Sequence, residues 1–241
     1  MSGILLEGTM YFKRVLPESI ATSGFLPFGN IVKFEISAES EQVERLSKQK
    51  GSYRTALDSV TLGSPTKLTI TTNELGDSKI LAMALLGLDE NYIVTGASVT
   101  GETITAVHDE WIPLAHQEVS SVVVTGHTLN DDYLVNSTLG MIKALSTGDI
   151  VDGSTITVNY TYASKNGKKV RGNVESIVKC QLILEGRNLA TDEDVIFRAP
   201  LWSISPSGAL DLLGDDFASV DLTGTLEMPT GFDEPYTIEI S

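Results

Sequence analysis

The residue types that most often carry chemistry are sparse in this chain, and its three histidines are the first to consider. They are His108, His116 and His127. In an extended segment His108 and His116 would lie about 26 Å apart at ~3.3 Å per residue, too far to share a metal ion. Only a sharp bend would bring them together with Glu118. We therefore predict no metal site at the histidines.

The acidic and sulfur-containing candidates give no stronger signal. The runs at residues 192–194 and 215–216 lack the spaced oxygen ligands of a calcium loop, so a turn is the simpler interpretation of both. The single cysteine, Cys180, lies in the strand-like IVKCQLIL and fits a small buried apolar residue better than a nucleophile. The chain contains no nucleophile elbow, phosphate-binding glycine loop or paired-cysteine spacing. We therefore predict that the protein is not an enzyme and needs no cofactor or metal.

The charge of the chain limits its partners. The formal net charge is −15, which argues against a nucleic-acid binder because such a protein needs a basic face to neutralise phosphates. After Arg198 no further lysine or arginine follows, whereas acidic residues continue to the end. Net charge speaks to solubility and association rather than to fold. Two interpretations stay open: ordinary solubility, or a surface that must not hold DNA.

Length and hydropathy indicate a β protein made in a cytoplasm. A chain of 241 residues suffices for one large β domain with arms, so we predict a single domain over residues 1–241. No N-terminal run resembles a signal peptide, and no apolar segment approaches the ~18 residues of a membrane span. We therefore predict no membrane contact.

A polar excursion between two half-buried strands is the most distinctive part of the chain. Alternation predicts one strand from Ile31, with Val32, Phe34 and Ile36 on one face, and further strands around Val60 and Leu62 and from Lys67. Loops longer than ~12–15 residues are usually functional or disordered. The charges in the excursion, at residues 38–57, are acidic first and basic later: Glu39, Glu41, Glu44, Arg45, Lys48, Lys50 and Arg54. This division suits a contact with another copy, and a solvated flexible loop is the alternative.

The rest of the chain predicts one helix among many strands. The helix is expected within Asn73–Leu88, capped by Asp77 or Ser78 and ended by Gly87, with Leu85 in the core. Later segments are assigned as follows: a loop or weak hairpin at residues 89–107, an apolar turn at 111–114, a buried strand at 119–129, a basic hairpin tip at 165–169, and a strand at 195–202 with an edge or bulge at Pro200.

Several separated segments resemble one family in the same order. They read GNIVKFEISAESEQVERLSKQKGSYRTALDSV, PTKLTITTNE, LAMALLG, DDYLVNSTLGMIKALSTGDIVDGSTITVNYTY and LWSISPSGALDLLGDDFASVDLTGTLE. Together they closely resemble the major tail tube protein of long-tailed, siphovirus-type bacteriophages. The resemblance implies a mainly β fold with one flanking α-helix, a β-sandwich or half-barrel with terminal arms, the C-terminal one at residues 229–241.

The same resemblance implies a structural role in a virion. The excursion would be an extended loop or hairpin that docks onto the neighbouring ring of a tube built from stacked, hexameric rings. The tube would assemble in the host bacterial cytoplasm around a tape-measure protein, end at tail terminator and distal tail proteins, and later conduct DNA without binding it specifically. The competing function is a β-sandwich adhesin or carbohydrate-binding module on a virion, with Tyr53, Trp111 and Phe232 as candidate aromatic platforms.

If one face of the strands packs on the core, the opposite face can line the channel of such a tube. The predicted lumen-facing residues, mostly short hydroxylic or charged and without an aromatic, are Lys33, Glu35, Lys67, Thr69, Thr71, Lys179, Gln181, Asp221, Thr223, Thr225 and Glu227. A slip of one residue in the register would exchange the two faces.

Overall fold

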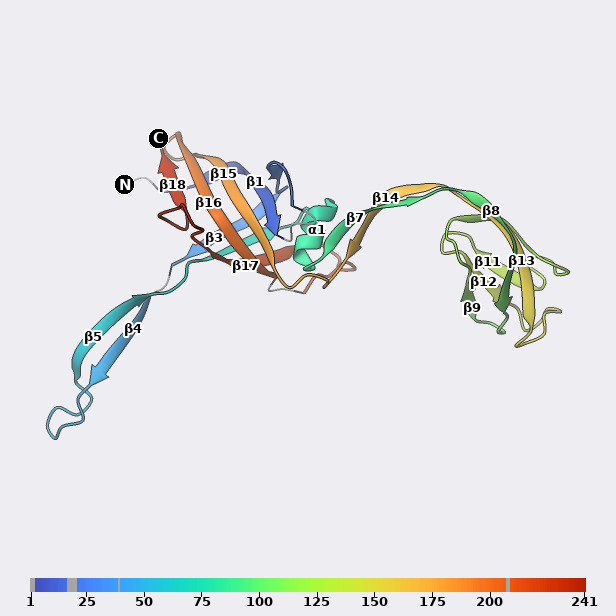
Figure 1. Cartoon of the computed structure of the whole chain (residues 1–241), viewed down its shortest axis with the longest axis horizontal. Coiled ribbons are helices and arrows are strands. Elements are labelled where there is room, and N and C mark those ends of the chain that lie inside the picture. Colours follow the sequence, from blue (N-terminus) through green and yellow to red (C-terminus); the bar gives the residue numbers. More distant parts are fainter. Residues whose placement is uncertain (1–2, 17–20, 39, 207–208) are drawn as a thin grey trace. The chain divides into compact units, whose positions relative to one another are not determined.

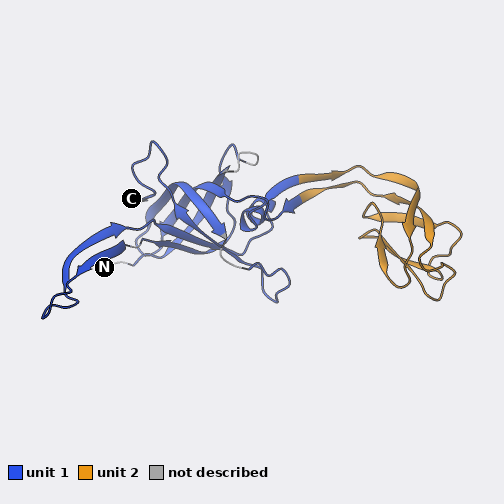
Figure 2. Ribbon diagram, turned by 60° about the horizontal axis from the view of Figure 1, so that its bottom comes forward, with its two compact units in different colours: residues 1–90, 169–241 blue, residues 91–168 orange. Residues whose placement is uncertain are grey.

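The chain folds into two compact units rather than into one domain. A computed structural model describes residues 3–16, 21–38, 40–206 and 209–241. Residues 1–90 and 169–241 form unit 1, and residues 91–168 form unit 2 (Figure 2). Each unit has its own cluster of buried apolar side chains. The prediction of a single domain is corrected here, because residues 91–168 bury a core of their own.

Unit 1 is built on a curved antiparallel sheet (Figure 1). Its strands run in the order β2-β1-β15-β16-β17-β6-β3, and β18 pairs with β16 beside this path. Their bounds are Leu6–Leu16 for β1, Leu26–Pro27 for β2, Ile31–Ser37 for β3, Lys67–Thr72 for β6, Val178–Asn188 for β15, Glu193–Pro206 for β16, Val220–Leu226 for β17 and Thr237–Ile240 for β18. The predicted C-terminal arm thus ends as a strand of this sheet.

Alternating side chains give the sheet one buried face. In β17 the buried residues are Val220, Leu222, Gly224 and Leu226, in the period of two that a pleated strand imposes. The ring of Phe34 in β3 lies 5.1 Å from that of Phe197 in β16, although β17 and β6 separate the two strands. The sheet therefore curls around its core, which agrees with the predicted half-barrel.

Pro200 marks the point where β16 changes its neighbour. Before it, residues 195–198 pair with β18; after it, residues 202–206 pair with β17. The pairing with β15 shifts register between Cys180 and Leu182, opposite Pro200. Proline has no N–H to donate to a ladder, so it is tolerated at a bulge. The predicted bulge is confirmed.

The largest buried side chain that the structure describes, Trp202, depends on a glycine in the neighbouring strand. Trp202 is fully buried and pairs with Leu226, and Gly224 lies two positions along β17, opposite Ile204. A Cβ at Gly224 would lie 2.4 Å from Trp202 Nε1 and 2.2 Å from the carbonyl oxygen of Ser203. Only glycine lets the two strands approach with the indole in place.

Helix α1, Ser78–Ala84, is shorter than the sequence predicts. Asp77 caps it as expected, because its Oδ1 accepts a hydrogen bond from Lys79 N at 2.8 Å. The helix ends in a Schellman motif, in which Leu86 has a φ of 46° and Gly87 N donates to the carbonyl oxygen of Ala82 at 2.7 Å. Leu85 is therefore at the C-cap and is 36% exposed, so its assignment to the core is wrong.

A buried arginine joins β1 to the end of the helix. Arg14 is buried, and its Nη2 donates to the carbonyl oxygen of Gly87 at 2.8 Å. Nε and Nη1 have no hydrogen-bond partner among the described residues. Burial lowers the pKa of this guanidinium, while Cys180, Asp89 and Glu175 act in the opposite direction. The alternation of β1 placed an arginine on the core side, and the sequence analysis did not identify it.

Unit 2 contains two small antiparallel sheets, ordered β10-β13-β8 and β11-β12-β9. The bounds are Ala97–Thr105 for β8, Trp111–Pro113 for β9, Val119–Val124 for β10, Tyr133–Asn136 for β11, Met141–Ala144 for β12 and Thr155–Tyr162 for β13. Residues 89–107 were predicted as a loop or weak hairpin and 111–114 as a turn, and both contain strands. Val99 and Ile104 of β8 pack on the core although they are five positions apart, because a bulge in the pairing with β13 interrupts the alternation between them. This interruption hid the strand in the sequence.

The predicted basic hairpin tip is also corrected. Residues 165–169 lie in β14, Lys165–Arg171, which pairs with β7, Leu88–Val94. Two side-chain contacts tie these strands together: Lys168 Nζ to Asn91 Oδ1 at 2.8 Å and Arg171 Nη1 to Glu90 Oε1 at 2.9 Å. Asn-Gly is a turn signal only where the chain reverses, and here a distant strand continues the ladder instead.

The helix packing predicts different costs for two truncations. Met83 is fully buried against the sheet, so Met83→Ala should lower the free energy of unfolding by about 2–5 kcal/mol. Leu85→Ala should cost clearly less, because Leu85 already contacts water. Urea denaturation of both variants checks this, and equal losses would contradict the placement of the helix.

Candidate functional site

The polar excursion is a β-hairpin that belongs to no larger sheet. Strands β4, Ser40–Leu46, and β5, Ala56–Gly63, pair only with each other, and every residue of both is exposed (Figure 1). The resemblance allowed a loop or a hairpin, and the structure shows the hairpin. It also corrects Val60 and Leu62, which were placed in a half-buried strand and lie in β5. We call residues 40–63 the hairpin.

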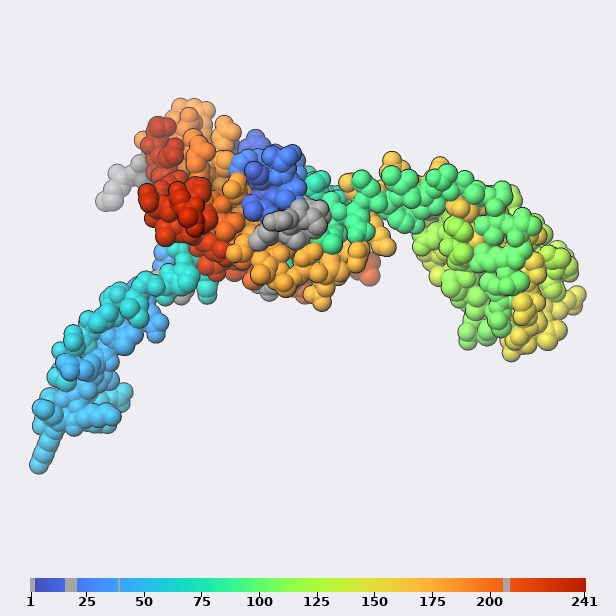
Figure 3. Space-filling model, viewed as in Figure 1, coloured from blue at the N-terminus to red at the C-terminus, as the bar shows by residue number. Residues whose placement is uncertain are grey.

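The register gives the hairpin two unlike faces. Val43 pairs with Val60 and Glu41 with Leu62, so Val43, Val60 and Leu62 share one face with Glu41 and with the pair Arg45–Asp58. The pairs on the other face are mostly polar, such as Gln42 with Thr61. Val43 and Val60 are 50% and 56% exposed. Both belong to the hairpin, which Figure 3 draws in light blue to cyan. The hairpin therefore groups apolar side chains on one face while they remain in contact with solvent.

The tip of the hairpin is ordered by its own hydrogen bonds. Ser47 is buried, its carbonyl oxygen accepts from Arg54 N at 2.7 Å, and its Oγ lies 2.8 Å from Ser52 Oγ. Lys48, Lys50 and Arg54 make no ion pair with another described residue. The tip thus presents cations on an ordered loop.

In the structure the charged side chains of the hairpin do not divide into an acidic half and a basic half. Glu41 and Glu44 lie on opposite faces of β4, since they are three positions apart. Arg45 reaches Asp58 of β5 at 3.9 Å. Glu39 lies outside the described residues. The basic tip, rather than a divided strand, is the main electrostatic feature of the hairpin.

The predicted lumen-facing residues do share one face of the unit 1 sheet. The register pairs Thr69 with Thr223, Thr71 with Asp221, Lys67 with Thr225 and Glu35 with Thr69, and the residues that alternate with them are buried or pack on the core. Lys179 and Gln181 alternate with the buried Cys180 and Leu182 on β15. We call this set, Lys33, Glu35, Lys67, Thr69, Thr71, Lys179, Gln181, Asp221, Thr223, Thr225 and Glu227, the polar face. The sequence analysis placed all of these residues on one face. It also placed Val32 on the opposite face with Phe34 and Ile36, whereas Val32 lies at a bulge and is exposed.

Side chains of the polar face bind one another. Thr71 Oγ1 donates to Asp221 Oδ1 at 2.6 Å, and Lys179 Nζ lies 2.6 Å from Glu227 Oε2. Lys33 Nζ lies 2.5 Å from Glu35 Oε2, and this contact raises the pKa of the lysine. The three lysines are matched by three carboxylates, so the formal charge of the face is zero. Two of the three lysines, Lys33 and Lys179, therefore already contact a carboxylate.

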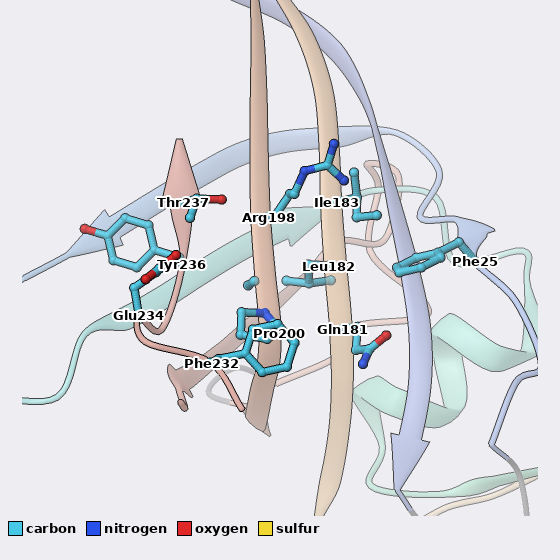
Figure 4. A pocket seen from close by; sticks show the side chains of 11 residues that line it. Phe25, Gln181, Leu182, Ile183, Arg198, Pro200, Phe232, Glu234, Tyr236 and Thr237 are labelled. Carbon is cyan, nitrogen blue, oxygen red and sulfur yellow. The ribbon is translucent and has the colours of Figure 1, made fainter. Parts of the chain in front are cut away.

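An apolar pocket of about 240 Å³ adjoins this face at Gln181 (Figure 4). Phe25, Phe232 and Tyr236 line it, and Pro200 lies in its floor. The sequence analysis expected no aromatic side chain here. It missed the pocket because Phe25, the bulge and the C-terminal arm are distant in the chain.

Comparison with known proteins assigns a family. Residues 4–230 match the family described as "Protein of unknown function UCP028589". The chain belongs to this family. No curated protein matched the chain. The family's description names no activity, so the surfaces described above carry the functional argument.

The histidines and the cysteine that the sequence analysis considered lie in ordinary packing contacts. Within residues 3–16, 21–38, 40–206 and 209–241, no three histidine, cysteine or acidic side chains are grouped as a metal site would require. His108 Nε2 lies 2.7 Å from the carbonyl oxygen of Ile150, and the His116 ring stacks on Tyr162 at 3.8 Å. Cys180 is buried, and burial raises the pKa of its thiol to about 12. The single described helix is too short to cross a membrane.

The exposed tip predicts where a protease cuts first. Trypsin added to dilute, unassembled protein should cleave at Lys48, Lys50 or Arg54 before other sites, because a protease needs an accessible loop. Mass spectrometry of the early fragments checks this. First cleavage within the main sheet would contradict an exposed hairpin on a stable body.

Proposed function

We propose that this protein is a structural virion protein that assembles with copies of itself into stacked rings and forms the tail tube of a long-tailed phage. The observation that carries the proposal is the hairpin, whose two strands are exposed and present Val43, Val60 and Leu62 to solvent. The sequence resemblance to major tail tube proteins supplies the context in which such a hairpin joins adjacent rings.

The energetics of the hairpin favour a covered state. An isolated two-stranded hairpin is marginally stable in water. The face with Val43, Val60 and Leu62 gains nothing from burial within its own chain, because those side chains are exposed. Docking on another copy would remove this apolar surface from water and fix the strands. The cationic tip would add attraction to a chain whose net charge is −15.

The polar face fits the wall of a DNA conduit. A wall that grips phosphates would need unpaired cations, because phosphate binding depends on lysine and arginine. Here Lys33 and Lys179 lie beside carboxylates, and threonines occupy the neighbouring positions. Threonine hydroxyl groups are hydrated and carry no charge that would bind a phosphate. The face therefore suits passage without specific binding.

The remaining parts of the proposal come from the resemblance. They are the hexameric ring, assembly around a tape-measure protein, contacts with tail terminator and distal tail proteins, and a location in the virion tail after assembly in the bacterial cytoplasm. An adhesin or carbohydrate-binding module is the alternative. Its candidate aromatics belong to different parts of the chain: Tyr53 lies at the hairpin tip, Trp111 lies under Lys143 at 5.4 Å in unit 2, and Phe232 lines the pocket of unit 1.

Removing the hairpin tests the proposal. Replacing residues 40–63 by a short turn should leave a folded, soluble protein, because the hairpin adds nothing to the core, and should abolish tubes. Circular dichroism checks the fold and electron microscopy checks the tubes.

A matched pair of variants separates the faces of the hairpin. Val43→Ser with Val60→Ser should weaken tube formation, whereas Gln42→Ser with Thr61→Ser should not, since those residues are on the polar side. Normal tubes from the deleted protein would refute the proposed role of the hairpin.

Reversing charge on the polar face tests the conduit. Asp221→Lys with Glu227→Lys should leave tubes largely intact and slow DNA delivery, because Lys179 and the new lysines would face phosphates without carboxylate partners. Tubes are counted by microscopy and delivery by DNA ejection from particles. Glu110→Lys with Asp131→Lys, in unit 2, makes the same change in charge as a control. Equal delivery by both variants would contradict the assignment of this face.

A further inference from the structure

The loop between β16 and β17 holds two large apolar side chains almost entirely in water. Leu213 is 96% exposed and Phe217 is 91% exposed, the highest values among the large apolar residues that the structure describes. Asp211 Oδ1 accepts a hydrogen bond from Leu213 N at 3.0 Å, so the turn that presents Leu213 is stabilised locally. Single exposed apolar residues are common, but two in one loop mark a contact surface. We call residues 211–217 the apolar loop.

The same unit contains a pocket of matching chemistry. It is the pocket of about 240 Å³ at the bulge of β16, walled by Phe25, Phe232 and Tyr236 (Figure 4). At Pro200 β16 exchanges β18 for β17 on one edge, while β15 continues to pair along its other edge and contributes residues 181–183 to the pocket. Its size and aromatic walls suit a leucine or phenylalanine side chain.

The charges at the pocket are mixed. Arg198 lines it, and its Nε lies 3.7 Å from Glu239 Oε1. Glu234 also lines the pocket, on the side of the C-terminal arm (Figure 4). The apolar loop carries Asp211, Asp215 and Asp216. The match between loop and pocket therefore rests on apolar side chains and not on charge.

We propose that Leu213 and Phe217 of one copy insert into this pocket on a second copy. The chain's own loop does not fill the pocket, because both side chains are exposed. The inference rests on the proposed self-assembly and adds a contact distinct from the hairpin. Because the loop and the pocket are different surfaces of one chain, the contact is heterologous and repeats from copy to copy until a ring closes.

The first test removes the apolar side chains of the loop. Full-length protein with Leu213→Ser and Phe217→Ser should lose its assemblies and sediment as a monomer, while its circular dichroism stays unchanged. The control, Leu189→Ser with Ile177→Ser, removes two half-exposed apolar side chains elsewhere in unit 1 and should assemble like the wild type. Assembly of the loop variant at wild-type concentration would overturn the inference.

The second test identifies the partner surface. Protein with Leu213→Cys is mixed with protein carrying Thr237→Cys, a residue that lines the pocket, and a bifunctional maleimide is added. A cross-linked dimer is expected on a denaturing gel. None is expected from wild-type protein, whose Cys180 is buried, or when Val151→Cys of unit 2 replaces the pocket variant.

The two proposals fail separately. Tubes without the cross-link would overturn the contact and leave the proposed function standing. A cross-link in protein that forms no tubes would support the contact and overturn the tube. The hairpin-deleted protein should show the cross-link without tubes.

Discussion

The pairing of β17 with β6 is the constraint on which both faces of unit 1 depend. Its register runs from Val220 opposite Thr72 to Thr225 opposite Lys67. Because Leu222 and Ile70 are buried in the core, a slip of one residue would bring charged side chains into it. Burial of one face therefore determines which side chains lie on the opposite face. The contacts between hydroxyl and carboxylate groups on the polar face depend in this way on the packing of the core.

The alternation of these strands could be predicted because one face of the sheet is buried and the other is exposed to solvent. The polar face was assigned from sequence for this reason. The bulge at Pro200 was predicted on a different ground, because proline has no N–H to donate to a ladder. The hairpin shows the limit of the same argument. Val60 and Leu62 alternate like a half-buried strand, but the pattern alone does not reveal whether anything covers them. Local periodicity shows which side chains would favour burial. Whether they are buried depends on segments that are distant in the chain.

Other features depend on contacts that no local pattern contains. Leu85 has the spacing of a core residue, but the helix ends one position earlier and turns it toward water. The Asn-Gly of β14 pairs with β7 instead of reversing the chain. The pocket at Pro200 combines Phe25 with the C-terminal arm. Each departs from the sequence prediction because a segment far along the chain decides the environment.

The hairpin and the apolar loop each hold exposed apolar side chains outside the core of unit 1. A chain that only needed to be a soluble monomer would gain stability by replacing them with polar residues. Contact with a second copy would remove these side chains from water. Self-assembly therefore explains both surfaces, the hairpin and the apolar loop. Electron microscopy of the purified wild-type protein at rising concentration tests that account most directly. Self-assembly predicts rings and then tubes, while dispersed single particles at every concentration would contradict it.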